Sequence, residues 1–142
     1  MNATEVVADA SIVVKWFVEE EESGKSLKLR DRYIEGKIRI IAPELMIFET
    51  LNALYYKRLF SEEELKQISE ALEAYSFTLY SLRGEYANKA LEVAFKNDIT
   101  IYDASYIALA IIRNTHVYTA DEKLIRKLKH EYQKYVKSIK DF

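Results

Sequence analysis

Three times along this chain, a short run of strand-forming residues ends in an aspartate that precedes a helix-forming segment. Asp9 follows Val-Val-Ala, Asp103 follows Thr-Ile-Tyr, and Asp121 follows Val-Tyr-Thr-Ala. Strands that alternate with helices predict a mostly parallel sheet with helices on both faces. Ligands of such sheets bind in the crevice at the carboxyl ends of the strands, so we expect the three aspartates to meet there.

The rest of the pattern predicts where the other elements of this α/β fold lie. Ser61 and Glu64 form a capping box that opens a helix, and Gly36 stands where a helix C-terminal cap belongs. Strands are expected at residues 5–9, 38–42, 77–80, 100–102 and 116–119, with an edge strand in the tail at 132–139. Helices are expected at residues 23–35, 44–59, 61–75, 84–97, 103–113 and 121–129, with a short helix after Asp9 capped by Ser11.

Composition limits the class of protein. A length of 142 residues fits a single domain spanning residues 1–142, and the absence of cysteine excludes disulfides and thiolate metal sites. The sequence has neither an apolar run that could span a membrane nor a signal peptide, so we expect a cytoplasmic protein. The net charge of −2 does not indicate nucleic-acid binding. Residues 113–142 are basic, however, and form either a phosphate-binding face or a solvated helix face.

A fourth carboxylate, Glu49, lies inside an expected helix, where it cannot act as a cap. On a helical wheel it shares a largely apolar face with Leu45 and Ala53, while Thr50 and Lys57 form the clearest polar stripe. A carboxylate on a buried face must be paired, protonated or bound to a metal. A metal site and a buried ion pair with Arg or Lys both remain open.

If the fold brings the four carboxylates together, they form a pocket of hard oxygen ligands, which Mg²⁺ and Mn²⁺ prefer. Two such ions can cleave a phosphodiester with an activated water. Each aspartate also has a simpler explanation as a helix N-cap. Ser11 and Thr119 lie near two of the acids and can hydrogen-bond a ligand, a metal-bound water or a helix end. The four acids are Asp9, Glu49, Asp103 and Asp121.

Two other classes of small α/β domain fit these residues poorly. A receiver domain needs adjacent acids after its first strand, but Asp9 is followed by Ala10 and Ser11. A nucleotide-binding domain needs a glycine-rich phosphate loop, whereas Gly24, Gly36 and Gly84 are isolated.

Four stretches, in order along nearly the whole chain, resemble the PIN-domain family, and most closely the VapC-type toxins of bacterial and archaeal toxin–antitoxin pairs. Each stretch alone is a weak signal, whereas the ordered set is fairly specific. The four are VVADASIVVKWF with Asp9, APELMIFETLNAL with Glu49 and Asn52, TIYDASYIALA with Asp103, and VYTADEKL with Thr119 and Asp121.

The resemblance implies an α/β/α sandwich around a parallel sheet in the order 3-2-1-4-5. It implies a Mg²⁺- or Mn²⁺-dependent endoribonuclease that forms a homodimer and is inhibited by a cognate VapB-type antitoxin. A non-catalytic PIN-like module that binds RNA or protein, and a PIN nuclease of RNA processing, remain alternatives. In the implied site the metal is held by Asp9, Glu49, Asp103 and Asp121, supported by Ser11, Asn52 and Thr119.

Overall fold

The computed structural model describes residues 3–142. In this part of the chain a five-stranded sheet runs in the order β3-β2-β1-β4-β5, and all four strand pairings are parallel. The α/β fold and the strand order 3-2-1-4-5 are therefore confirmed. The strands are β1 (Thr4–Ala8), β2 (Ile38–Pro43), β3 (Thr78–Tyr80), β4 (Val117–Thr119) and β5 (Val136–Ser138).

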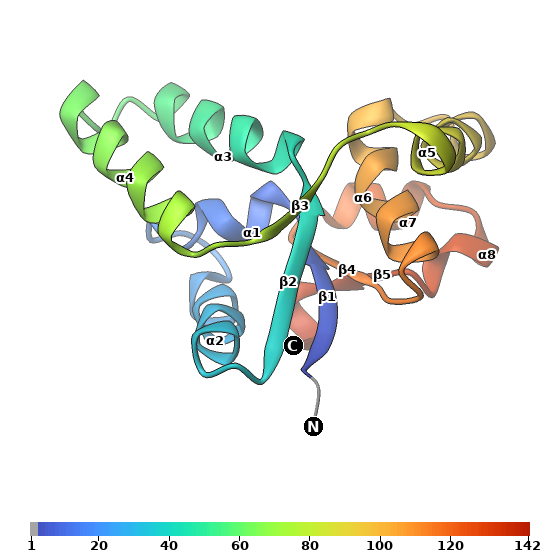
Figure 1. The fold of residues 1–142 in the computed structure, drawn as a ribbon, viewed down its shortest axis with the longest axis horizontal. Coiled ribbons are helices and arrows are strands. Elements are labelled where there is room, and N and C mark those ends of the chain that lie inside the picture. Colours follow the sequence, from blue (N-terminus) through green and yellow to red (C-terminus); the bar gives the residue numbers. More distant parts are fainter. Residues whose placement is uncertain (1–2) are drawn as a thin grey trace.

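Helices cover both faces of the sheet (Figure 1). The first four lie on one side and the next four on the other, and a short 3-10 helix, Ile139–Asp141, follows β5. None of the helices within residues 3–142 is long and apolar enough to cross a membrane. The first group is α1 (Ala10–Val14), α2 (Ser23–Ile34), α3 (Leu45–Tyr56) and α4 (Glu62–Ala74). The second group is α5 (Gly84–Asn97), α6 (Ile101–Ile112), α7 (Glu122–Lys127) and α8 (His130–Gln133).

The core is densest around β1, β2 and α6. Val7 and Ile41 are paired across the two strands and are completely buried, as expected for parallel strands covered on both faces. Every residue of α6 from Ala104 to Ala110 is buried, because the helix packs on β1, β2 and β4 and is itself covered by α5. Small side chains such as Ala104 and Ala108 let α6 approach the sheet closely, as the sequence predicts.

Two local predictions are wrong, and both concern how a helix begins. Residues 100–102 do not form a strand, because the Thr100 hydroxyl accepts a hydrogen bond from the Asp103 backbone N–H and caps α6. Asp103 therefore lies in the first turn of a helix rather than after a strand. Ser11 does not cap α1 either, since it lies inside that helix and Asp9 occupies the N-cap position.

Two other helix boundaries agree with the sequence. Gly36 has a φ of 77° and ends α2, and its N–H donates to the carbonyl of Tyr33. At the start of α4, Ser61 and Glu64 form the expected capping box, in which each side chain accepts a hydrogen bond from the other residue's backbone N–H.

Replacing Ser61 with alanine is expected to lower the free energy of unfolding by about 1 kcal/mol, because the N–H of Glu64 loses its acceptor. Thermal melts should show a decrease in Tm of about 3 °C. Ser69→Ala, at an exposed position inside the same helix, is the matched control and should be neutral or slightly stabilising. Equal losses in the two variants would contradict the capping role.

Candidate active site

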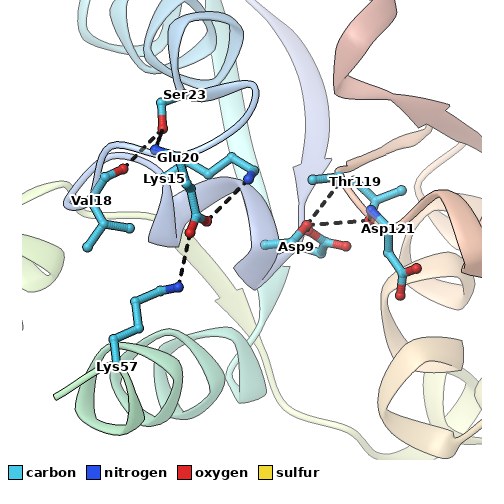
Figure 2. A network of polar contacts seen from close by, with 10 residues as sticks. Asp9, Lys15, Val18, Glu20, Ser23, Lys57, Thr119 and Asp121 are labelled. Carbon is cyan, nitrogen blue, oxygen red and sulfur yellow. Dashed lines mark hydrogen bonds and ion pairs between the residues drawn. The ribbon is translucent and has the colours of Figure 1, made fainter.

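A pocket of about 520 Å³ lies at the carboxyl ends of the central strands, and all four predicted carboxylates line it. Asp9 follows β1, and Asp121 follows β4 after a single intervening residue, so the parallel pairing of these strands places both acids at the same edge of the sheet. Figure 2 shows them on facing segments. The four predicted acids are Asp9, Glu49, Asp103 and Asp121, and a fifth acid, Glu20, also lines the pocket.

Helix capping accounts for only one of the three aspartates. The Asp121 carboxylate accepts a hydrogen bond from the Leu124 N–H, 3.1 Å away, and so caps α7. Asp9 stands at the N-cap position of α1, but its side chain makes no capping hydrogen bond. At the start of α6 the capping residue is Thr100, whose hydroxyl accepts a hydrogen bond from the Asp103 N–H. The carboxylates of Asp9 and Asp103 therefore make no capping hydrogen bond to their helices.

Glu49 points toward α6, where the Tyr106 hydroxyl donates a hydrogen bond to its Oε1 at 2.5 Å. No lysine or arginine forms an ion pair with Glu49 within residues 3–142, so the structure does not support the buried ion pair that the sequence left open. Tyr106 was not singled out from the sequence. Its position one turn after Asp103, among small and apolar residues, is the signal that points to it.

The orientation of α3 differs from the helical-wheel prediction. Thr50 is completely buried rather than part of a polar stripe, and its hydroxyl lies 3.5 Å from the sulfur of Met46 within the same helix. A threonine can be buried in a helix when its hydroxyl finds a partner one turn earlier. Lys57 instead lines the acidic pocket, whereas Asn52 is exposed and lies outside it.

Asp9, Glu49 and Asp103 hold their protons more strongly than free acids do. Burial, with a smaller contribution from the charge of Glu49, raises the pKa of Asp9 from 3.8 to about 6. Burial also raises the pKa of Glu49, and the negative charge of Asp103 raises it further. Burial likewise raises the pKa of Asp103, and the negative charge of Asp121 adds to that shift. The ionised acids therefore repel one another, and a bound cation would relieve that repulsion.

Ser11 and Thr119 connect the two strand ends that carry Asp9 and Asp121. The Ser11 hydroxyl donates to the Asp9 carboxylate and accepts from the Ala120 N–H at 2.9 Å. The Thr119 hydroxyl, which is completely buried, accepts from the Asp121 N–H at 3.0 Å (Figure 2). These bonds hold the turn after β4 against the start of α1 and fix the spacing of the two acids.

A basic wall of the same pocket was not predicted. Lys15 and Lys57 both bind the carboxylate of Glu20, at 3.2 Å and 3.0 Å, and all three residues line the pocket (Figure 2). Lys15 lies within the VVADASIVVKWF stretch, one turn after Ser11, so its helical spacing is a signal in the sequence. Glu20 lies in an acidic run, where nothing distinguishes it from its neighbours.

The carboxylate oxygens of the pocket are the type of ligand that a hard divalent cation binds. The four predicted carboxylates face one pocket, and oxygen ligands of this type are those that Mg²⁺ and Mn²⁺ prefer. Within residues 3–142, however, no three Asp, Glu or His side chains are grouped closely enough to enclose a single ion. The carboxylates that share this pocket would therefore have to move toward a cation on binding.

Known proteins resemble this chain in sequence and in fold. The family model described as the PIN domain matches residues 6–130. Ribonuclease VapC3 of Pyrobaculum aerophilum is 28% identical over 126 residues, which cover 86% of this chain and 93% of that protein. VapC20 of Mycobacterium tuberculosis, a toxin that cleaves the sarcin–ricin loop, has a TM-score of 0.65 at 12% identity, covering 82% of this chain and 90% of that one. A toxin–antitoxin complex from Klebsiella pneumoniae contains a chain with a TM-score of 0.63 at 14% identity, covering 83% and 88%.

Proposed function

Because the chain belongs to the PIN-domain family and is distantly related to a VapC ribonuclease, we propose that it is a Mg²⁺- or Mn²⁺-dependent endoribonuclease. The observation that carries this proposal is the meeting of four carboxylates from four separate segments in one pocket. A non-catalytic binding module would have no need of acids whose mutual repulsion burdens the fold. We take residues 1–142 as one PIN-like domain.

Each pocket acid has a role in this proposal. Asp9 comes from the end of β1 and Glu49 from α3, and Asp103 and Asp121 complete the ligand set from α6 and the start of α7. Bound Mg²⁺ or Mn²⁺ would supply an activated water and would stabilise the charge that develops on the phosphate. Tyr106 orients Glu49, and Ser11 orients Asp9, through the hydrogen bonds that hold each carboxylate in place.

The biological setting we propose is that of a toxin from a VapBC-type pair. Its substrate is RNA, its inhibitor a cognate VapB-type antitoxin, and its location the cytoplasm. The names of the related ribonuclease and of the toxin–antitoxin complex support this assignment. Large apolar side chains on the surface, including Phe48 (74% exposed), Phe95 (85%) and Tyr102 (61%), support a homodimer that also binds another protein.

Purified protein is expected to cleave structured RNAs when Mg²⁺ or Mn²⁺ is present and to stop when EDTA is added. Asp103→Asn should reduce the rate roughly a hundredfold or more, because it removes one of the four pocket charges. Gel analysis of the RNA products under each condition measures both effects. Cleavage that survives both EDTA and Asp103→Asn would show that the activity comes from another site or a contaminating nuclease.

A further inference from the structure

One wall of the acidic pocket has more positive than negative charges. Lys15 ends α1, Lys57 ends α3, and Glu20 lies in the connection between α1 and α2. Glu20 Oε1 is 3.2 Å from the Lys15 nitrogen, and Oε2 is 3.0 Å from the Lys57 nitrogen. One carboxylate thus bridges two ammonium groups, and the wall keeps a net charge of about +1.

Neither lysine has more than one side-chain hydrogen-bond acceptor within residues 3–142. Each ammonium group has three N–H donors, and Glu20 is the single side-chain partner of either lysine within residues 3–142. The Lys15 side chain is only 11% exposed, so little water can reach it. Glu92 on α5 also bridges two lysines, but that group lies outside the acidic pocket, whereas Lys15 and Lys57 both line it.

We propose that Lys15 and Lys57 bind a phosphodiester of the RNA strand, and that Glu20 is the counter-ion this phosphate displaces. A phosphodiester carries one negative charge and two free oxygens, as a carboxylate does, so it can take the place of Glu20 between the two ammonium groups. The basic wall would then hold one phosphate of the strand while the next one along reaches Asp9 and Asp121 across the pocket (Figure 2). This inference rests on the proposed ribonuclease function.

Two substitutions break the same ion pair but change the charge of the wall in opposite directions. Lys57→Met removes one positive charge, whereas Glu20→Gln removes the competing negative charge. If the pair were merely structural, both changes would alter RNA binding in the same direction. If the wall binds phosphate, Lys57→Met weakens binding and Glu20→Gln strengthens it. Lys57→Arg keeps the charge and should restore binding, and Lys89→Met, which breaks a comparable pair with Glu92 on α5, is the matched control.

The affinity is measured by fluorescence anisotropy of a short fluorescein-labelled single-stranded RNA, with Mn²⁺ present and Asp103→Asn in every protein to prevent cleavage. Lys57→Met should raise Kd roughly three- to tenfold and flatten the dependence of log Kd on log salt by about 0.7. Glu20→Gln should lower Kd at low salt. Thermal melts confirm that each variant is folded. If Lys57→Met does not fold, the comparison of Lys57→Arg with Glu20→Gln still tests the phosphate site.

The outcomes separate this inference from the proposed function. If Lys57→Met and Glu20→Gln both weaken binding, or if Lys57→Met behaves like Lys89→Met, the phosphate site is wrong. Cleavage of RNA by the wild-type protein in parallel assays would leave the ribonuclease function intact in that case. If the wild-type protein neither binds nor cleaves any RNA, both proposals are overturned.

Discussion

Asp9→Asn is expected to stabilise the metal-free protein at pH 8 and to abolish RNA cleavage. The pKa of Asp9 is about 6 in the folded protein and near 3.8 in a free aspartate, so the folded state binds more protons than the unfolded state between these values. The free energy of unfolding therefore falls as pH rises from about 4 to about 7, by at most about 3 kcal/mol from this group. Asparagine carries no charge, so the free energy of unfolding of the variant should not fall with pH on account of this position.

Urea denaturation in EDTA measures the effect at pH 4.5 and at pH 8. The variant should be more stable at pH 8, and its advantage should be much smaller at pH 4.5. The amide oxygen of asparagine can still accept the hydrogen bond from Ser11. Cleavage should fall roughly a hundredfold or more. Asp31→Asn, on the surface of α2, is the matched control and should change neither property. Lower stability of Asp9→Asn at pH 8 would mean that the fold itself needs the carboxylate.

The convergence of Asp9 and Asp121 could be predicted from the sequence because it follows from topology. Once β1 and β4 are recognised as parallel neighbours, the residues after them must meet at one edge of the sheet, whatever the details of packing. The start of α6 could not be predicted in the same way. Threonine is common both in strands and at helix N-caps. The hydrogen bond from the Asp103 N–H to the Thr100 hydroxyl favours the N-cap.

Two features of the site could not be predicted from the sequence. The helical wheel could not orient α3, because the partner that permits Thr50 to be buried is a methionine sulfur, which polarity scales do not count. The bridge from Glu20 to Lys57 joins segments 37 residues apart, and nothing local to either residue predicts it. The basic wall of the pocket therefore emerged only from the structure.

Glu49→Gln separates a role in metal binding from a role in the fold. Burial and the charge of Asp103 raise the pKa of Glu49, so its ionised form costs the metal-free protein free energy near neutral pH. Glutamine keeps the shape of the side chain, and its carbonyl oxygen can accept the hydrogen bond from Tyr106. Metal-free thermal melts should show an unchanged Tm or an increase of a few degrees, corresponding to about 1 kcal/mol.

The response to Mn²⁺ should move in the opposite direction. A ligand that binds only the folded state stabilises it in proportion to the logarithm of its concentration over Kd, so a tenfold loss of Mn²⁺ affinity removes about 1.4 kcal/mol of that gain. RNA cleavage should fall sharply in parallel. Glu44→Gln is the matched control, because Glu44 adjoins the same helix, accepts a hydrogen bond from Ser81 at 2.6 Å and lies outside the acidic pocket. Its Mn²⁺ response should equal that of the wild type.

A purely structural Glu49 predicts different melts. If this carboxylate balanced a buried cation, Glu49→Gln would strand that charge and cost about 3–5 kcal/mol without metal. No lysine or arginine within residues 3–142 forms an ion pair with Glu49, and its one hydrogen-bond donor there is the uncharged Tyr106. The expected result is therefore a stable variant that has lost its response to Mn²⁺. A large drop in Tm together with an unchanged Mn²⁺ response would remove Glu49 from the proposed metal site.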